Sequence, residues 1–201
     1  MLGVHDALLA QLERSRQLGF LGPGAVDAHL RHSEAYLGAL QGITGTVVDL
    51  GAGGGVPGLV VAVARPDLHL VLLDAMAKRC RFLEEAVATL GLRAEVVEGR
   101  AEEIARSGWR GQVDAVIARS FGPPAVTAEC AAPLLRVGGR LVVSEPPEVA
   151  SRWPAAELSV LGLRPTARPT TSATLQVLEQ IAPCPDRYPR RTGIPAKRPL
   201  F

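Results

Sequence analysis

A short apolar run that opens into a cluster of glycines restricts this chain more than any other feature. The stretch VVDLGAGGGVPG, residues 47–58, places five glycines and one proline directly behind a predicted strand. Glycine allows positive φ and lets a backbone approach a ligand closely, and proline suits the first turn of a following helix. The stretch therefore predicts a strand–turn–helix unit of the kind that holds a nucleotide cofactor.

Strand-like and helical segments alternate after residue 45. Runs such as VLL and AVIA are apolar on both faces, as strands of a parallel sheet covered by helices are. Helices are expected around residues 76–90 and over Ala125–Leu135, and two more precede the glycine turn. The predicted strands are Thr46–Leu50, Leu68–Leu73, Ala94–Glu98, Val113–Ala118 and Arg140–Ser144. This order predicts an open, doubly wound α/β sheet.

The last part of the predicted sheet differs from the rest. Leu163–Arg168 and Leu175–Ile181 are joined by too few residues for a crossover helix, so we expect an antiparallel closing pair. Pro165 and Pro169 push the first of these strands toward an edge or an end. We expect one domain made of N-terminal helices in residues 1–45, an α/β core in 46–182 and a basic, proline-rich tail in 183–201.

Length and composition exclude several classes of protein. The chain has 201 residues, 47% of them hydrophobic and 21% charged, which suits one globular domain. No apolar run approaches the roughly 18 residues of a membrane span, and the N-terminus lacks the layout of a signal peptide. We therefore expect a cytoplasmic protein with no membrane partner. The cysteines are too scattered for a zinc site, and His29 and His32 lack a third ligand, so we expect no metal.

The glycine cluster fits two cofactor patterns. Read from the end of the strand, Asp49 is followed by Gly51, Gly53 and Gly55, the GxGxG arrangement of enzymes that use S-adenosylmethionine (SAM). Read from Gly53 to Gly58, it is the GxGxxG of dinucleotide proteins, but its first glycine then falls several residues beyond the strand. Such a turn can also bind nothing. The turn alone leaves all three interpretations open.

Two further features bear on this choice. Asp74 closes the second strand, where a carboxylate can accept both hydroxyls of a ribose. Dinucleotide proteins place an acid there too, and helix capping is the plain alternative. A reversed last strand is typical of the SAM-dependent methyltransferase sheet and unusual in dinucleotide domains. Together these features favour a methyltransferase, and Gly58 then becomes a helix-packing residue.

Several segments resemble the glucose-inhibited division protein B family. They are VVDLGAGGGVPGLVVAVARPDLHLVLLDAMAKRCRFLEEAV, GRAEE, DAVIARSF and the closing RYPRRTGIPAKRPL, which is similar to the C-terminal signature of that family. The resemblance implies a class I, Rossmann-like SAM-dependent methyltransferase sheet, mostly parallel with an antiparallel last strand and preceded by helices. It also implies an enzyme that methylates N7 of a guanine in small-subunit (16S) ribosomal RNA.

The resemblance carries site residues with it. It implies that Gly51, Gly53 and Val56 line the SAM site and that Ala101 and Glu102 flank the adenine. It also identifies an arginine used near the cofactor and the target base, and that residue here is Arg119. By sheet geometry alone, Arg119 follows the fourth strand at the edge where ligands of such folds bind, with a surface salt bridge as the alternative.

Contacts with ribosomal RNA are expected from two places. His29 is an active-site neighbour by resemblance only. The tail carries Arg190, Arg191 and Lys197, a basic group suited to phosphate, although a solvated basic tail is the plain alternative. Guanine N7 can attack a methyl group without losing a proton, which agrees with the lack of any nucleophile–base pair in the sequence.

The chain also departs from the family. His32 stands where the family has an acid, and the family's longer N-terminal region has no counterpart in the sequence. After the fifth strand, Glu145 replaces a lysine that is expected to face RNA, and an acid there would repel a phosphate. These departures leave open a diverged SAM-dependent methyltransferase for another RNA or a small molecule, a non-catalytic SAM- or RNA-binding relative, or a dinucleotide-binding oxidoreductase.

Overall fold

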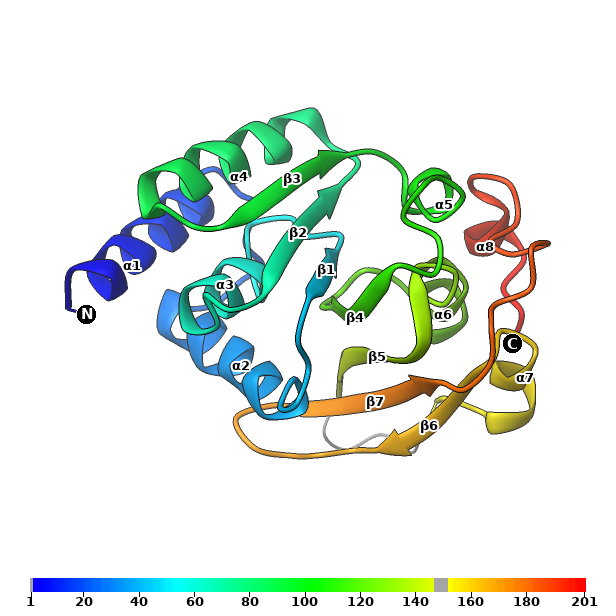
Figure 1. Ribbon diagram of the computed structural model, residues 1–201. Helices are drawn as coiled ribbons and strands as arrows, with labels where there is room; N and C mark the ends of the chain where they lie inside the picture. Colours follow the sequence, from blue (N-terminus) through cyan, green and yellow to red (C-terminus); the bar gives the residue numbers. More distant parts are fainter. Residues whose placement is uncertain (1, 147–151) are drawn as a thin grey trace.

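One twisted sheet with helices on both faces forms the protein (Figure 1). The computed structural model describes residues 2–146 and 152–201. Within them the sheet has seven strands in the order β3-β2-β1-β4-β5-β7-β6. The strands are β1 (Thr46–Leu50), β2 (His69–Asp74), β3 (Ala94–Glu98), β4 (Val113–Ala118), β5 (Leu135–Glu145), β6 (Leu163–Ala167) and β7 (Thr174–Gln180).

The strand directions place the ends of the central strands together. β1 pairs in parallel with β2 and β4, so that Val48 lies opposite both Val71 and Val116. β2–β3 and β4–β5 are also parallel, whereas β7 is antiparallel to both β5 and β6. The predicted antiparallel closing pair is therefore confirmed. Because five neighbouring strands run the same way, their carboxyl ends meet at one edge, where ligands of open α/β sheets bind.

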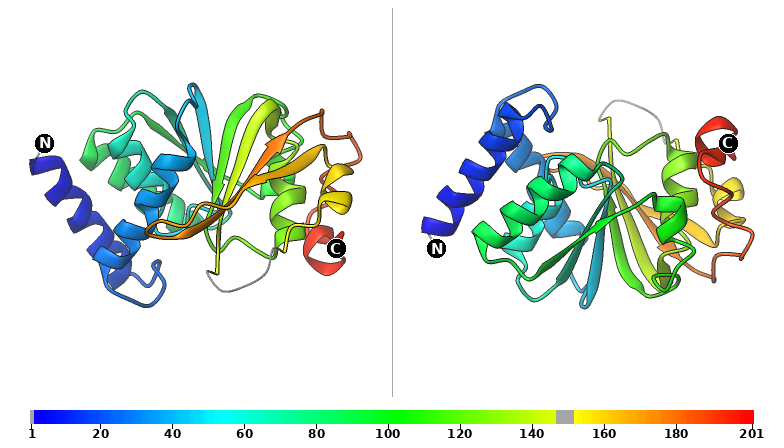
Figure 2. Two further views of the ribbon diagram at one scale, coloured as in Figure 1. Left: turned by 90° about the horizontal axis from the view of Figure 1, so that it is seen from below. Right: turned by 90° about the horizontal axis from the view of Figure 1, so that it is seen from above.

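Helices cover the two faces in separate groups (Figure 2). One face packs against α2 and α3 through a core that includes Tyr36, Val61 and Ile117, and α1 and α4 lie outside them. The other face packs against α5, α6, α7 and the C-terminal segment through Val116, Cys130 and their neighbours. The helices are α1 (Leu2–Gln17), α2 (Val26–Ala39), α3 (Gly58–Ala64), α4 (Ala77–Leu90), α5 (Ala101–Ile104), α6 (Pro124–Ala131), α7 (Ala155–Ser159) and α8 (Ile194–Lys197).

The main error in the predicted elements concerns the helix Ala125–Leu135. α6 ends at Ala131, and Leu135 already belongs to β5. Pro133 explains the early end, since proline offers no N–H and disfavours helical geometry in the residue before it. The β4–β5 ladder is irregular between Val113 and Ala115, so the glycines at 138–139 lie inside β5 instead of ending a helix.

The predicted basic tail is folded onto the core. Tyr188, Leu200 and Phe201 pack against the cluster on the α6 side of the sheet, and α8 lies beside α5 and α6 (Figure 1). Among the residues that the structure describes, no helix is long and apolar enough to cross a membrane.

Candidate active site

The glycine turn after β1 adopts the backbone that only the strand-end register requires. Gly51, Gly53 and Gly55 have φ of +74°, +54° and +92°, the region that favours glycine. The N–H groups of Gly51 and Ala52 donate to the carbonyl of Leu73, 2.8 and 2.9 Å away, which ties the turn to the end of β2. These conformations agree with GxGxG and not with a register that starts at Gly53.

Gly58 has a different role, as the sequence predicted. A Cβ atom there would lie 2.4 Å from both Asp49 Oδ2 and Leu72 Cδ2. The absence of a side chain lets α3 pack directly on the ends of β1 and β2. Gly58 is therefore a helix-packing glycine.

Two cavities meet at Gly51. One, of about 180 Å³, lies on the side of α1 and its following loop. It is lined by Phe20, Leu21, Gly22, Gly51, Ala52, Gly53, Gly54, Val56, Arg79, Arg119 and Ser120. The other, of about 170 Å³, lies on the side of α5 and α6. It is lined by Gly51, Leu73, Asp74, Ala75, Gly99, Arg100, Ala101, Glu102, Phe121, Val126, Cys130 and Ala196. We call them the first and the second cavity.

The structure brings most of the predicted cofactor residues to these two cavities. Gly53, Val56 and Arg119 line the first, and Asp74, Ala101 and Glu102 line the second, with Gly51 common to both. Gly55 lines neither. A Cβ atom on it would lie 2.4 Å from Leu59 Cδ1, so its positive φ serves the path of the turn.

Asp49 lies behind the turn. Its side chain is buried, Oδ2 accepts a 2.8 Å hydrogen bond from the Gly58 N–H, and Oδ1 has no partner among the described residues. Burial raises the pKa of Asp49 to about 7, against the opposing effect of the Gly58 hydrogen bond. In this arrangement the carboxyl group of Asp49 supports the turn and the start of α3 from below.

Asp74 supports the turn from the other side. Its Oδ2 accepts from the Gly53 N–H and its Oδ1 from the Met76 N–H, each at 2.9 Å. The second of these bonds is a capping contact at the start of α4, the alternative considered for this residue. A carboxylate offers about four acceptor positions, so two remain for the hydroxyls of a ribose.

Arg119 is held by a histidine at the end of β4. Its Nη2 donates to Nδ1 of His29 at 2.5 Å, and Nε2 of His29 lies 3.1 Å from the Gly22 carbonyl. Because the guanidinium can only donate, His29 is neutral with its proton on Nε2. Arg119 Nη1 is buried without a partner among the described residues, and burial lowers the pKa of Arg119. The predicted surface salt bridge for Arg119 is therefore wrong: the cation keeps one donor for a ligand.

A third cavity of about 320 Å³ adjoins the first at the ends of β4 and β5. It is lined by Ser120, Gly122, Val143, Ser144, Glu145, Pro146, Arg152 and Trp153. Ser120 belongs to both cavities and is the single non-glycine residue with positive φ, +56°, among the described residues. Strain of this kind is concentrated at functional sites.

Glu145 does not present the free negative charge expected from the sequence. Its carboxylate is buried and accepts two hydrogen bonds from Arg152, 3.1 Å from Nε and 2.8 Å from Nη2. The paired guanidinium is the more exposed partner. Pro147 and Glu148, which follow in the sequence, lie outside the described residues. The acid that argued against an RNA substrate is therefore neutralised.

The basic tail residues have different environments. Arg190 is tied to the buried Glu129 of α6, with Nη2 of the arginine 2.6 Å from the carboxylate. Arg191 and Lys197 are exposed. Only these two of the three predicted tail residues present a cation to solvent.

His32 does not replace the charge of the family's acid. Burial and the nearby positive charge of Arg119 lower the pKa of His32 to about 4, so the side chain is neutral at neutral pH. In the part of the chain that the structure describes, no three His, Cys, Asp or Glu side chains are grouped to hold a metal ion.

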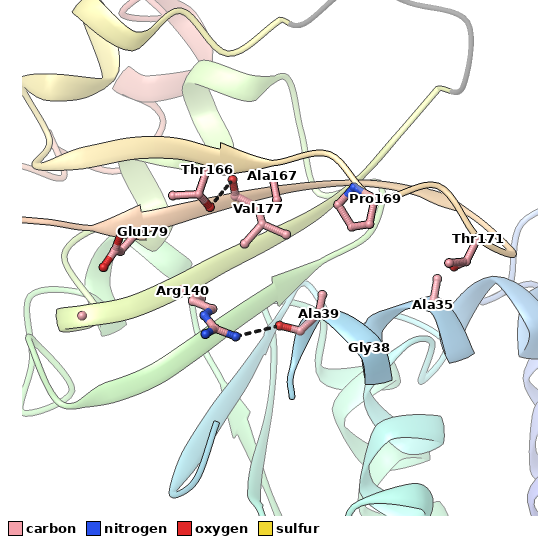
Figure 3. Close-up of a pocket in the computed structure, with 11 residues that line it drawn as sticks. Ala35, Gly38, Ala39, Arg140, Thr166, Ala167, Pro169, Thr171, Val177 and Glu179 are labelled. Carbon is pink, nitrogen blue, oxygen red and sulfur yellow. Dashed lines mark hydrogen bonds between the residues drawn. The ribbon is translucent and has the colours of Figure 1, made fainter. Parts of the chain in front are cut away.

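The largest hollow in the protein lies away from this edge (Figure 3). It has a volume of about 470 Å³ and lies between α2 and the strands β5, β6 and β7. Arg140 crosses one side of it and donates to the Ala39 carbonyl at 3.2 Å. It shares no lining residue with the three cavities described above.

Sequence reasoning missed several lining residues. Phe20–Gly22 and Arg79 complete the first cavity, Ser120 joins it to the third, and Ala196 closes the second. None of these has a local pattern that marks it, because each reaches the site through packing between distant segments.

Comparison with known proteins identifies the family. The sequence profile described as "GidB: rRNA small subunit methyltransferase G" matches residues 24–157. The chain belongs to this family. Two relatives carry the name "Ribosomal RNA small subunit methyltransferase G". The protein from Rubrobacter xylanophilus is 34% identical over all of this chain and 83% of its own length. That from Deinococcus radiodurans is 41% identical over 77% of this chain and 65% of its own length.

Solved structures confirm the class I methyltransferase fold. A methyltransferase from Geobacter sulfurreducens superposes with a TM-score of 0.61, at 16% identity, over 87% of this chain and 90% of its own. The antibiotic-resistance methyltransferase Kmr has a TM-score of 0.55, at 17% identity, over 75% and 93%. Membership of the GidB family also confirms SAM as the cofactor, and the dinucleotide alternative falls.

The residues of the two cavities fit SAM chemically. The first cavity offers Arg79 and the unpartnered Nη1 of Arg119 to the carboxylate of an amino acid. The second is mostly apolar, as an adenine requires, with the carboxylates of Asp74 and Glu102 at its rim for polar groups. Gly51, between them, leaves the backbone bare where a ligand crosses from one cavity to the other.

Proposed function

We propose that the protein transfers the methyl group of SAM to N7 of a guanine in small-subunit (16S) ribosomal RNA. The observation that carries the proposal is the line of three cavities, joined first at Gly51 and then at Ser120. A cofactor that fills the first two cavities has its methyl-bearing half beside the third. Membership of the GidB family gives the acceptor class, ribosomal RNA.

The acceptor atom sets modest chemical demands. SAM, when bound, supplies an electrophilic methyl group whose bond to sulfur breaks as a bond to the N7 lone pair forms. No proton leaves N7, so no general base is needed. The site agrees with this requirement, because Nδ1 of His29 is already occupied by Arg119 and cannot act as a base. The residues of this chain therefore act by orientation and electrostatics.

The predicted site residues take distinct roles in this proposal. Asp49 and Gly55 hold the shape of the turn, and Asp74 holds the turn and binds the ribose. Arg119 offers its free Nη1 to the reacting groups at the junction of the first and third cavities. His29 acts through Arg119. The exposed Arg191 and Lys197, together with Arg152, are suited to RNA phosphates.

The deciding experiment is transfer of label from SAM to RNA. The purified protein is incubated with labelled SAM and with naked 16S RNA or assembled small subunits, and the modified base is identified after digestion. We expect label in a single 7-methylguanine. Label in another base or in a small molecule would show a diverged acceptor. SAM binding without any transfer would support a non-catalytic relative.

Two variants separate the roles within the site. Asp49→Ala removes the support of the turn, so SAM binding should weaken, by about tenfold or more if one buried hydrogen bond to a charged group is lost. Arg119→Ala should keep most SAM affinity and lose methyl transfer. Arg164→Ala is the control, because Arg164 forms an exposed pair with Glu179 on the far edge of the sheet. Equal loss of SAM affinity in the first two variants would contradict this division.

A further inference from the structure

The second cavity, which takes the adenine in the proposed function, is closed by the last residues of the chain. Most of its lining comes from the ends of β1, β2 and β3 and from α6. Ala196 of α8 is the one lining residue from beyond residue 130. The C-terminal segment, defined here as residues 184–201, therefore reaches the cofactor site itself.

We propose that the C-terminal segment is a permanent wall of the adenine half of the cofactor site, with Ala196 as the residue that limits the size of that half. This inference rests on the proposed function only in taking the ligand of the second cavity to be an adenosyl group. It assigns the conserved-length basic stretch a role in cofactor binding in place of a free, RNA-seeking tail.

The first anchor of the segment is a buried ion pair. The Glu129 carboxylate, 0% exposed, accepts from Arg190 three times: from the backbone N–H at 2.8 Å, from Nε at 2.9 Å and from Nη2 at 2.6 Å. A buried carboxylate without a cation is strongly unfavourable, so the core requires Arg190 in this position. Cys130, the next residue of α6, lines the second cavity. The anchor therefore lies directly beside the cofactor site.

The second anchor uses a residue of the site. Glu102 lines the second cavity, and its Oε1 accepts the N–H of Gly193 at 2.9 Å. Thr192 donates to Glu103 Oε1 at 3.1 Å. Gly193 has φ of +79°, a conformation that favours glycine and turns the chain into α8 toward the cavity. The carboxylate that was predicted to flank the adenine thus also positions the wall.

Two arginines hold the start of the segment. Arg110 donates from Nη1 to the Tyr188 carbonyl and from Nη2 to the Cys184 carbonyl, each at 2.8 Å. Arg106 donates from Nε to the Pro189 carbonyl at 3.0 Å. These bonds, with the packing of the last two residues against the core, join the segment to the α5–β4 region along its whole length.

A substitution of the wall residue tests the inference. Ala196→Phe introduces a ring beside a cavity of only about 170 Å³. Ala156→Phe, at an exposed position of α7, is the matched control. SAM and S-adenosylhomocysteine affinities are measured by calorimetry, and thermal unfolding without ligand checks that each variant is folded. We expect at least a tenfold rise in both dissociation constants for Ala196→Phe and none for Ala156→Phe. Unchanged affinity in a folded Ala196→Phe protein would overturn the inference.

Variants of the anchor test whether the segment serves the cofactor or the RNA. Arg190→Ala should weaken SAM binding, with partial recovery in Arg190→Lys, while binding of 16S RNA measured without SAM changes less than twofold. Loss of RNA binding with SAM affinity intact would instead make the segment an RNA contact and overturn the inference. If Arg190→Ala does not fold, Arg190→Lys and Ala196→Phe decide.

The outcome is separable from that of the proposed function. A wild-type protein that binds SAM and shows the Ala196→Phe effect, but labels no RNA, would refute the proposed function and leave the wall in place. A wild-type protein that labels RNA while Ala196→Phe binds SAM normally would refute the wall alone. A wild-type protein that does not bind SAM would overturn both.

Discussion

The buried carboxyl group of Asp49 links the stability of the protein to pH. Burial raises its pKa from 3.8 to about 7, with a smaller contribution from the negative charge of Asp74. The folded state therefore holds the proton more tightly than the unfolded state. Its stabilising effect is fully present below about pH 4 and is lost as pH rises to about 7, above which it changes no further. A pKa difference of about 3 corresponds to about 4 kcal/mol at 1.36 kcal/mol per unit.

Asp49→Asn removes this titration. The amide resembles the protonated carboxyl group and keeps an oxygen for the Gly58 N–H, so the variant should lack the pH dependence that belongs to this residue. Urea unfolding of both proteins between about pH 5 and about pH 8 gives the difference in unfolding free energy at each pH. We expect this difference to shift by about 3 kcal/mol in favour of Asn across that range.

The comparison has a matched control and a clear negative outcome. Asp27→Asn changes an exposed acid in the first turn of α2, so its effect on the unfolding free energy should stay within about 0.5 kcal/mol at every pH. Parallel stability curves for wild type and Asp49→Asn would refute the reasoning, because they would mean that Asp49 ionises in the folded protein as readily as in the unfolded chain.

Three further predictions can be checked on the same protein. Gly58→Ala should lower the unfolding free energy by about 1–3 kcal/mol, because its Cβ would lie 2.4 Å from Leu72 Cδ2; Gly38→Ala, in α2 with nothing within 4 Å, should raise it by about 0.5–1 kcal/mol, and equal effects in urea unfolding would contradict the packing role. The buried cysteines should react slowly with a thiol reagent, since burial raises the pKa of Cys80 to about 11, and rapid labelling in a spectrophotometric assay of the native protein would argue against this core. Ser120→Gly should leave stability unchanged or raise it by up to about 1–2 kcal/mol, because it removes a side chain from positive φ, and a thermal melt that moves down would show that the conformation is not strained.

The fold was largely predictable because its strands are short and apolar on both faces. β1, β3 and β4 have the predicted bounds, and the closing antiparallel pair followed from the lack of room for a crossover. β5 was predicted from Arg140, whereas it begins at Leu135. The Gly138–Gly139 pair concealed its first half, because glycines in a sequence resemble the end of a helix more than the middle of a strand.

The candidate site was predictable where its residues follow strand ends and hidden where distant segments meet. Arg119 follows β4, so sheet geometry alone placed it at the ligand edge. Its contact with His29 joins residues 90 apart, and no local pattern encodes it. The pairing of Arg190 with Glu129 left one signal that could have been used. Glu129 is the only charged residue in the helix PAVTAECA, and a lone acid in an apolar helix calls for a cation from elsewhere in the chain.

The walls of the cofactor site come from opposite ends of the polypeptide, which has a consequence for how the protein is made. Phe20–Gly22 close one cavity and Ala196 closes the other. A growing chain folds from its N-terminal side as it is synthesised, so the sheet can assemble before Arg190 exists. Until then the Glu129 carboxylate has no cation to enter the core with. The newborn protein therefore becomes competent to bind its cofactor only when its last residues have been added, and a chain released early is left without that ability.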